Sequence, residues 1–578
     1  MVQRPGGMPE ADPSLGNSGA PETSPPTESA GPGGKASSLV RSGMIMALGT
    51  IASRVTGFLR TAVIVAALGT GLLANAYNTA NTIPNLIYDL LLGGILTSVI
   101  VPLIVRARER DPEYGRQFEQ RLFTLAVFFL GGLTVVATLL APILINMLGS
   151  GFSGDQRELA VLFSWFFLPQ IFFYGIGAFA GAILNTRNRF AAPMWAPVLN
   201  NVVVIVVGVM FLLTASGKVD PSTIPDAQVH LLALGTTGGI VLQTIALWPS
   251  LRAAGFRWRP RFDFQRGELG EAGRMAGWTL MYVVATQIGF MVTTNLLNSA
   301  GVRGQAEGIG EGFGYTPYFN AYQLFQLPYA IVAVSVITAL LPRMSEHAAE
   351  GHRELVRDDF SSGLRLSAVV MLPAAALMFV LGPEIATVLF AHGNTTHADA
   401  LVIANVLQMM AIALVPFSTY QLMLRVFYAF GDTRTPAFIS LATVGTNIAM
   451  ALAVYELLPT RRIVVGVAGG FALANIVGTV VCWAVLRWRL GGMDGRRVLG
   501  GHVKLLIAVW PLIGFAFATH KIADAWIGTA SALPALGVLL VGSAGGGVLY
   551  LTFARLLRVG EVETLVGTLT SRLGRGRA

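Results

Sequence analysis

Two arginines and an aspartate lie inside long apolar stretches, where charged side chains are rare and usually functional. Arg54 and Arg60 occupy the stretch 39–68, and Asp89 occupies the stretch 73–105. Arg54 is about 14 residues from either end of its stretch, roughly 20 Å along a helix, which is too far for its guanidinium to reach water comfortably. The planar, permanently charged arginine fork binds phosphate well. These residues predict a cationic site for an anionic substrate; a structural ion pair with Asp89 is the alternative.

Helix geometry limits how the two arginines could share one site. Arg54 and Arg60 are six residues apart and therefore differ by about 240° around an ideal helix. Both can face one cavity only if the helix bends, and Gly57 is the candidate position for a bend. Uncharged polar residues in similar stretches could contact the substrate or hydrogen-bond another helix; they are Asn75, Asn85 and Gln323.

The sequence carries no recognisable catalytic or nucleotide-binding motif. It has no glycine-rich loop ending in Lys-Ser or Lys-Thr, no histidine pair at helical spacing and no Gly-x-Ser-x-Gly. The single cysteine, Cys482, excludes an internal disulfide and a multi-cysteine metal site. We therefore expect no enzymatic activity, no cofactor and no metal. Transport would draw on an ion gradient, the membrane potential or the substrate's own gradient.

Long apolar helices must position these residues, because the chain is too apolar for water. Of its 578 residues 53% are hydrophobic and 12% are charged, and the mean hydropathy is +0.63. A helix needs roughly 20 apolar residues to cross a bilayer. About fourteen such stretches are present, which predicts an all-α integral membrane protein. Their ranges are 39–68, 73–105, 122–148, 159–184, 192–213, 231–251, 276–297, 318–341, 364–381, 401–430, 437–457, 463–486, 503–519 and 533–553.

Basic residues alternate between the predicted loops. The loops after even-numbered helices, together with the first two residues of the helices that follow them, carry 23 Lys and Arg residues, whereas the corresponding segments after odd-numbered helices carry 6. Because basic loops stay in the cytoplasm, we expect both termini and the even-numbered loops there. The net charge of +9 then reflects topology and contact with anionic membrane lipids. Nucleic-acid binding is not expected.

Four short motifs recur in the same order at spacings of 231–245 residues, pairing 75–77 with 320–322, 98–102 with 338–342, 140–142 with 381–383 and 235–239 with 466–470. Such a repeat is typical of transporters and predicts two pseudo-symmetric six-helix lobes plus two extra C-terminal helices. The expected segments are a disordered cytoplasmic tail (1–38), an N-terminal lobe (39–251), a basic cytoplasmic linker (252–275), a C-terminal lobe (276–490), the two extra helices (491–556) and a basic cytoplasmic tail (557–578). Two lobes around a central cavity suit alternating access.

Several motifs together resemble the signature of the MurJ (MviN) lipid II flippases. They are Ser53-Arg54-Val55, Gly57-Phe58-Leu59-Arg60, Pro84-Asn85-Leu86, the stretch 181–190 with Pro193 and Ala196-Pro197, Phe427-Tyr428-Ala429, and Asp432-Thr433-Arg434-Thr435-Pro436. The resemblance runs from about residue 39 to the C-terminus. It implies the fold of the multidrug/oligosaccharidyl-lipid/polysaccharide exporter superfamily. It also implies transfer of lipid II, the undecaprenyl-diphosphate-linked disaccharide-pentapeptide, from the inner to the outer leaflet of a bacterial cytoplasmic membrane.

The resemblance also bears on individual residues. Arg54 and Arg60 coincide with arginines of the family's cavity, so they are the first candidates for substrate contacts. We also predict substrate contacts for Asn75, Asn85, Asp89 and Gln323. The chain departs from many members, which carry an aspartate, an arginine, a glutamate and an arginine at the positions of Asn75, Tyr88, Gly93 and Gln323. These differences leave the head-group contacts of the second and eighth helices open.

Three other functions compete with this reading. The first is export of another polyprenyl-linked glycan or an amphipathic drug. The second is a membrane scaffold for cell-wall synthesis enzymes. The third is an integral-membrane enzyme acting on polyprenyl diphosphates, which would need clustered acids or histidines that the sequence lacks. We predict a flippase whose partners are lipid II, membrane lipids and cell-wall synthesis proteins.

Overall fold

The computed structural model describes residues 32–91, 111–187, 189–215, 217, 220–263, 270–309 and 313–563, and the regular elements in these ranges are helices. The first half contains α1 (Pro32–Leu68), α2 (Leu72–Leu91), α4 (Pro112–Leu139), α5 (Ala141–Leu148), α6 (Gly154–Phe167), α7 (Gln170–Thr186), α8 (Ala191–Thr214), α9 (Asp226–Ile245) and α10 (Trp248–Ala253). The second half contains α11 (Gly270–Ala306), α12 (Tyr315–Pro328), the π-helical turn η2 (Tyr329–Ala333), α13 (Val334–Ala349), α14 (Arg353–Val380), α15 (Gly382–Phe390), α16 (His397–Ala429), α17 (Arg434–Leu457), α18 (Thr460–Arg489), α19 (Gly495–Trp526) and α20 (Ala532–Leu556).

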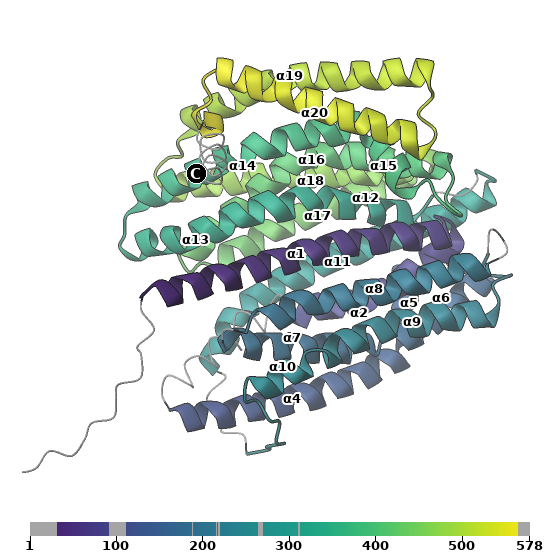
Figure 1. Ribbon diagram of the computed structural model, residues 1–578, viewed down its shortest axis with the longest axis vertical. Coiled ribbons are helices and arrows are strands. Elements are labelled where there is room, and N and C mark those ends of the chain that lie inside the picture. The colour runs from purple at the N-terminus through teal and green to yellow at the C-terminus, as the bar shows by residue number, and fades with distance from the viewer. Residues whose placement is uncertain are drawn as a thin grey trace, which may run out of the picture.

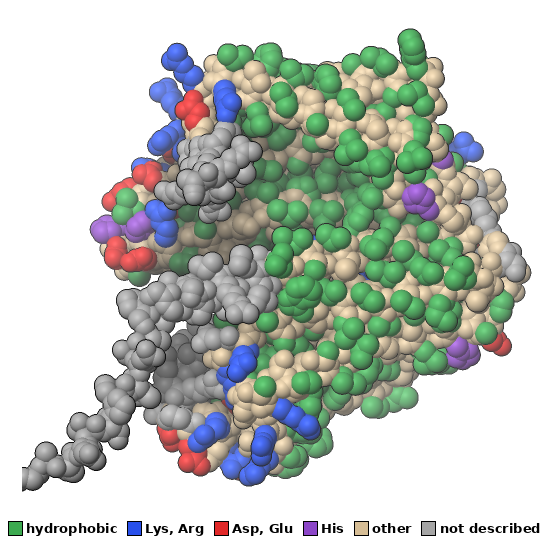
Figure 2. All heavy atoms as spheres, in the orientation of Figure 1, with side chains coloured by type: hydrophobic (Ala, Val, Ile, Leu, Met, Phe, Trp, Pro, Cys, Tyr) green, Lys and Arg blue, Asp and Glu red, His purple; other side chains and the backbone are tan. Residues whose placement is uncertain are grey.

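The predicted helical membrane fold is confirmed. Among the described residues, 13 helical segments are long and apolar enough to cross a membrane. They correspond to every predicted stretch except 73–105, which begins as α2 and is described only as far as Leu91. Large apolar side chains such as Leu213 and Leu533, each 81% exposed, point outward as expected for contact with lipid tails. Figure 2 shows hydrophobic side chains spread along the length of the helices.

Proline accounts for some of the breaks in the long apolar stretches. Proline lacks the N–H that a helix interior requires, so a helix often breaks or deforms at it. Leu168 and Pro169 separate α6 from α7, and α12 passes into the π-helical turn η2 after Pro328. In contrast, α2 continues through Pro84 and α16 continues through Pro416. A proline alone therefore does not mark a break in this chain.

The helices form two bundles side by side, with α19 and α20 on one flank (Figure 1). In the N-terminal bundle (α1–α10), α8 packs between α1 and α9, and α2 packs on α6. In the C-terminal bundle (α11–α18), α16 is central and contacts α12, α14 and α18. Helices α19 and α20 pack on each other and against α14 and α15. The predicted linker 252–275 lies partly outside the described residues, so the predicted segment boundaries stay predictions.

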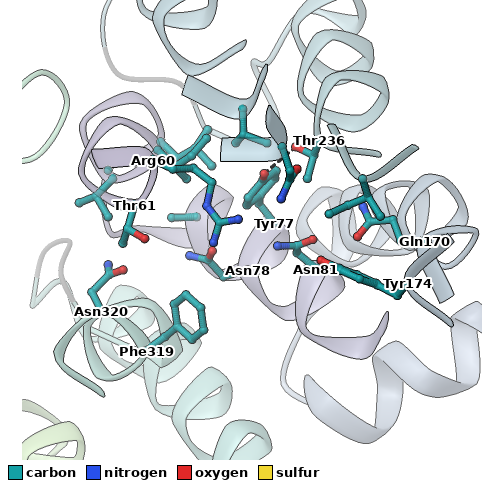
Figure 3. Close-up of a pocket in the computed structure, with 18 residues that line it drawn as sticks. Arg60, Thr61, Tyr77, Asn78, Asn81, Gln170, Tyr174, Thr236, Phe319 and Asn320 are labelled. Atoms are coloured by element: carbon teal, nitrogen blue, oxygen red, sulfur yellow. Dashed lines mark hydrogen bonds between the residues drawn. The ribbon is translucent and has the colours of Figure 1, made fainter. Parts of the chain in front are cut away.

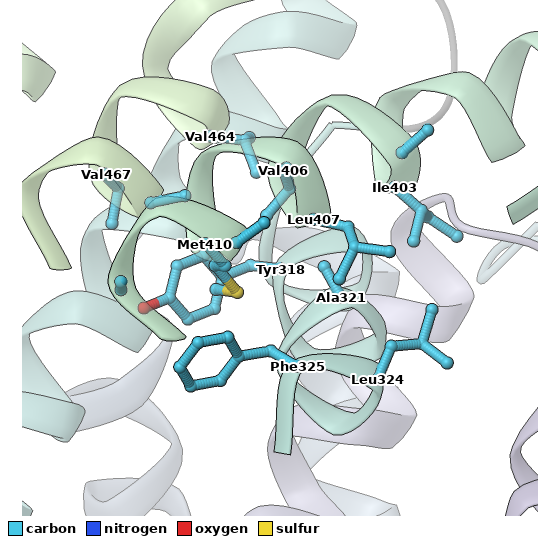
Figure 4. Packing of buried hydrophobic residues seen from close by; sticks show 14 of the residues in the cluster. Tyr318, Ala321, Leu324, Phe325, Ile403, Val406, Leu407, Met410, Val464 and Val467 are labelled. Carbon is cyan, nitrogen blue, oxygen red and sulfur yellow. The ribbon is translucent and has the colours of Figure 1, made fainter. Parts of the chain in front are cut away.

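Each bundle has its own apolar core. In the N-terminal bundle the core includes Tyr77, Phe163 and Phe167, whose rings contact one another at centroid distances of 5.3–5.6 Å. In the C-terminal bundle, Phe325 of α12 and Met410 of α16 are fully buried, as Figure 4 shows. In lipid the hydrophobic effect does not drive helices together, so van der Waals packing of this kind is a main force between membrane helices. Each core therefore holds its bundle together as a unit.

Basic side chains gather at the end of the molecule where α1 begins (Figure 2). We call this the basic end; its arginines include Arg121, Arg187, Arg343, Arg365 and Arg489. Several of them pair with acids, as in Arg187 with Glu119 at 2.6 Å and Arg121 with Asp263 at 2.7 Å. The opposite end, called the far end, contains residues 68–72, 313–316 and 392–396. The helices run between these two ends (Figure 1).

Candidate functional site

A small cavity surrounds Arg60 inside the N-terminal bundle (Figure 3). Its walls come from α1, α2, α7, α8 and α9, and α12 of the other bundle adds Phe319 and Asn320. Its volume is about 50 Å³, whereas a single water needs roughly 10–15 Å³ in this measure. The cavity can therefore hold a few waters in this conformation. A diphosphate would need the walls to move apart.

The lining of the Arg60 cavity is polar for a site among membrane helices. Its polar residues are Arg60, Thr61, Tyr77, Asn78, Asn81, Gln170, Tyr174, Asn200, Thr236 and Asn320. Arg60 is half-buried, and the Tyr174 hydroxyl lies within electrostatic range of both Arg60 and Asp89. Within the described part of the chain, the buried atoms Asn200 Oδ1, Gln170 Oε1 and Asn320 Nδ2 have no hydrogen-bond partner. Buried polar atoms need a partner, so the cavity fits a polar ligand or bound water.

Arg54 does not line the Arg60 cavity. Its side chain is exposed, about one and two-thirds turns earlier on α1. Helix α1 is continuous from Pro32 to Leu68, so the angular separation of the two arginines on an ideal helix persists. Gly57 instead permits close packing: a Cβ there would lie 3.3 Å from Asn201 Nδ2. The predicted joint site of Arg54 and Arg60 is not formed in this conformation, and a substrate contact by Arg54 stays a prediction.

Asp89 is exposed, near the last described turn of α2. The ion pairs among the described side chains do not include one between Asp89 and either arginine. Asn85 is half-buried and donates from Nδ2 to the Asn81 carbonyl, one turn earlier, at 2.9 Å. Asn81 lines the Arg60 cavity, so Asn85 lies one turn beyond it. Gly93 lies outside the described residues.

Asn75 is placed between the bundles rather than in the Arg60 cavity. It is 1% exposed; its Oδ1 accepts the Thr316 N–H at 2.9 Å, and its Nδ2 donates to the Phe313 carbonyl at 3.3 Å. Gly314 passes so close that a Cβ there would lie 2.5 Å from Asn75 Nδ2. Gln323 is half-buried and is not among the residues that line the Arg60 cavity. Substrate contacts by Asn75 and Gln323 stay predictions.

Further hydrogen bonds join the bundles at the far end. Asn394 donates from its backbone N–H to the Ala66 carbonyl at 2.8 Å and from Nδ2 to the Ala67 carbonyl at 2.7 Å. Thr395 Oγ1 donates to the Val65 carbonyl at 2.8 Å, and these carbonyls belong to the last turn of α1. Asn78 Nδ2 donates to Thr316 Oγ1 at 3.1 Å. The far end is therefore closed by polar contacts from both bundles.

Most residues around Arg60 were not predicted from the sequence. One detectable signal was the spacing of Asn75, Asn78, Asn81 and Asn85, which recur every three or four residues along α2. That spacing places amides along one face of a helix. Asn78 and Asn81 line the cavity, and Asn75 contacts the other bundle. The other lining residues come from helices far away in sequence, and no local pattern indicates them.

Comparison with known proteins gives a consistent result. The profile of the family described as "Lipid II flippase MurJ" matches residues 64–534. A probable lipid II flippase MurJ of Rhizobium meliloti (strain 1021) is 27% identical over 465 residues, covering 80% of this chain and 82% of that protein. One of Synechocystis sp. (strain ATCC 27184 / PCC 6803 / Kazusa) is 28% identical over 490 residues, covering 83% and 89%.

Two solved structures share the fold. A lipid II flippase MurJ in an inward closed conformation superposes with a TM-score of 0.68 at 20% identity, over 89% of this chain and 98% of that chain. An inward-facing multidrug resistance MATE family transporter of the MOP superfamily gives 0.61 at 16% identity, over 76% and 94%. The two-bundle helical architecture is therefore the one seen in transporters of this kind.

Proposed function

This chain belongs to the lipid II flippase MurJ family, and from that premise we propose how its helices move lipid II between leaflets. It is a multi-pass membrane transporter, and its substrate is lipid II. Lipid II is carried from the inner to the outer leaflet by alternating access. The diphosphate of the substrate binds at Arg60, while the polyprenyl tail stays in the membrane beside the bundles.

The Arg60 cavity is the single observation that carries this proposal. A diphosphate entering a low-dielectric interior loses its hydration, so it requires a cation and hydrogen-bond donors. Arg60 supplies the cation, and Asn78 and Asn81 supply amide groups on the adjoining wall. The unpartnered buried donor Asn320 Nδ2 can exchange water for a head-group contact. A tight cation cluster would hold the anion too firmly for release; one half-buried arginine among neutral amides avoids this.

The orientation follows from the basic residues. The basic end lies in the cytoplasm together with both termini, because Lys and Arg are concentrated in the loops of that side. The far end then faces the outside, where Asn75, Asn394 and Thr395 hold the bundles together. Release of lipid II to the outer leaflet requires these hydrogen bonds to break. Closure at the basic end completes the cycle, and the membrane is the bacterial cytoplasmic membrane.

Cell-wall synthesis proteins are further proposed partners. The basic end carries exposed arginines such as Arg343, whose side chain is 64% exposed, and anionic lipids or acidic protein segments fit such a surface. A scaffold without transport would also use this surface, while the Arg60 cavity would have no role. Export of another polyprenyl-linked glycan would use the same cavity, because the diphosphate is shared.

The test is flipping of lipid II by the purified full-length protein in liposomes, followed with a reagent that modifies only outward-facing lipid II. Arg60→Ala is expected to slow flipping about 10-fold or more, the value of one charge-assisted hydrogen bond. Arg60→Lys keeps the charge and is expected to lose less. Arg303→Ala is the matched control, since Arg303 is exposed and pairs at 2.9 Å with Glu307, the residue that follows the end of its own helix.

Three results would contradict the proposal in different ways. Equal flipping rates for the wild type and Arg60→Ala would show that the diphosphate does not bind at Arg60. Equal flipping of lipid II and an unrelated polyprenyl-linked glycan would favour the broader exporter. Unchanged outer-leaflet lipid II in cells depleted of the protein, with cell-wall synthesis mislocalised, would favour the scaffold.

A further inference from the structure

A second and larger cavity lies inside the C-terminal bundle. Its volume is about 370 Å³, within the range of roughly 300–1,000 Å³ that is usual for small-molecule sites. Helices α11, α12, α16, α17 and α18 and the turn η2 form its walls. The described residues that line it are aromatic, amide, hydroxyl or small apolar residues, and none is acidic or basic. They include Tyr282, Tyr322, Tyr329, Gln421, Asn447 and Asn475.

The two cavities occupy equivalent places in the repeated bundles. In the N-terminal bundle the Arg60 cavity is lined by α1, α2, α7, α8 and α9, which are the first, second, fourth, fifth and sixth predicted helices. The second cavity is lined by α11, α12, α16, α17 and α18, which are the first, second, fourth, fifth and sixth predicted helices of the C-terminal lobe. Tyr77 lines the first and Tyr322 lines the second, and these tyrosines end the repeated motifs 75–77 and 320–322. The duplication therefore preserved a pocket in each half. The two pockets differ in charge, because Arg60 lines the first and no charged residue is among the described lining of the second.

One helix, α12, separates the two cavities. Phe319 and Asn320 face the Arg60 cavity, whereas Tyr318 and Tyr322 line the second. An α-helix with its side chains is about 10–12 Å thick, so the two cavities lie about one helix diameter apart. Tyr322 is also within electrostatic range of Asp89 on α2. A substrate with an anionic part and an adjoining neutral part could therefore occupy both cavities at once.

We propose, resting on the proposed function, that the second cavity binds the uncharged outer sugar of lipid II while the diphosphate lies at Arg60. Aromatic rings offer apolar faces to the faces of a sugar ring, and amide groups pair with its hydroxyl and acetamido groups. Asn447 is placed for such a contact: its Nδ2 donates to Thr293 Oγ1 at 3.2 Å, and its buried Oδ1 has no partner among the described residues.

Charge argues against binding of the diphosphate and of cationic drugs in this cavity. A diphosphate in this cavity would lose its hydration without meeting a cation. An organic cation would find aromatic faces but no acidic residue in the described lining. Arg425, which stacks on Tyr428 at 5.6 Å and lies beside the Tyr329 hydroxyl, would repel such a cation. A neutral sugar bears neither penalty.

The experiment compares three lipids: lipid II, its precursor with one sugar fewer, and undecaprenyl diphosphate. Each is titrated into the full-length protein in lipid nanodiscs. An unrelated polyprenyl-linked glycan is titrated into the wild type as a reference. Asn447→Leu and Gln421→Leu remove amides from two walls of the cavity, and Asn405→Leu is the matched control at an exposed position of α16 outside its lining. We expect each cavity variant to bind lipid II about 3- to 10-fold more weakly, the value of one net hydrogen bond. Affinity for the one-sugar precursor and for undecaprenyl diphosphate should not change.

Equal weakening for all three lipids, or no weakening for any of them, would overturn the sugar assignment. Preferential binding of lipid II by the wild type would still leave the proposed function standing. A wild-type protein that binds lipid II no better than an unrelated polyprenyl-linked glycan would overturn the proposed function and, with it, this inference. Two measurements show whether a loss of lipid II affinity comes from misfolding. They are the thermal midpoint of each variant and the lipid II affinity of Asn447→Gln, which keeps the amide.

Discussion

Replacing Asn75 by alanine is expected to open the far end of the molecule. In the wild type, Asn75 accepts the Thr316 N–H and donates to the Phe313 carbonyl, at 2.9 and 3.3 Å. Thr316 lies in the first turn of α12 and Phe313 lies just before that helix, both in the C-terminal bundle, whereas Asn75 belongs to α2 in the N-terminal bundle. The variant loses both bonds without disturbing the core of either bundle. The closed conformation should therefore become less stable relative to the open one.

The size of this effect follows from the two bonds. Each contributes about 0.5–1.5 kcal/mol net, so together they stabilise the closed far end by about 1–3 kcal/mol. A difference of about 1.4 kcal/mol is tenfold in an equilibrium constant. The ratio of open to closed protein should thus rise about 5- to 150-fold. The contacts of Asn394 and Thr395 with the end of α1 remain, which keeps the closed state populated.

Spin labels at Ala227 and Ala398 can measure this shift. Both residues are exposed, begin helices at the far end and belong to different bundles. The single cysteine, Cys482, is buried and is replaced by alanine so that labels attach only at the two chosen sites. Pulsed electron resonance then reports the distance between the bundles. We expect a larger fraction of long distances in Asn75→Ala.

A matched control separates this effect from general damage. Asn146 is exposed and accepts a hydrogen bond from Arg157 within the same bundle, at 3.3 Å, so Asn146→Ala should leave the distances unchanged. An Asn75→Ala variant with wild-type distances would refute the role of Asn75 in holding the bundles. If its flipping also fell, the substrate contact predicted from the sequence would be the better explanation.

Three further outcomes are expected. Arg54→Ala should slow lipid II flipping less than Arg60→Ala in the liposome assay, because Arg54 lies outside the cavity; an equal loss would place Arg54 in the substrate path. Burial alone would raise the pKa of Asp432, but hydrogen bonds at the start of α17 and the ion pair with Arg489 outweigh it and lower the pKa below 3.8. Asp432→Asn should therefore lower the thermal midpoint at pH 7, and the difference from wild type should shrink as the pH falls through that lowered pKa; a constant difference would contradict this. Tyr550→Phe should cost about 0.5–1.5 kcal/mol in detergent unfolding, since its hydroxyl donates to a backbone carbonyl of α14 at 2.7 Å; no change would show that water replaces this bond.

The helices could be predicted from the sequence because lipid imposes a simple rule. Each span needs a long apolar run, and the runs in this chain are separated by polar or glycine-rich breaks. The sequence also predicted that Arg60 faces a polar site, since a charged side chain in an apolar run is expected to face a polar interior. In the structure Arg60 lines a polar cavity. Arg54 does not follow the same rule in this conformation, because its side chain is exposed although it lies deeper in the apolar run than Arg60.

The partners of the uncharged residues could not be predicted. Asn75 is bonded to residues 238 and 241 positions away, and an amide in an apolar helix is equally well satisfied by a ligand or by another helix. Asn85 bonds to its own helix instead. The cavity of the C-terminal bundle likewise arises from five helices whose tyrosines and amides show no local pattern. Only packing brings them together.

The shared wall of the Arg60 cavity makes the cavity itself temporary. Phe319 and Asn320 belong to one bundle, and Arg60 and Tyr77 belong to the other. Any relative rotation of the bundles therefore takes the enclosure apart, so the compartment lasts only as long as the conformation that creates it. The affinity for the substrate is therefore coupled directly to the relative orientation of the two bundles. Discharge then needs no dedicated ejection step, because the movement that exposes the cargo also removes part of what held it.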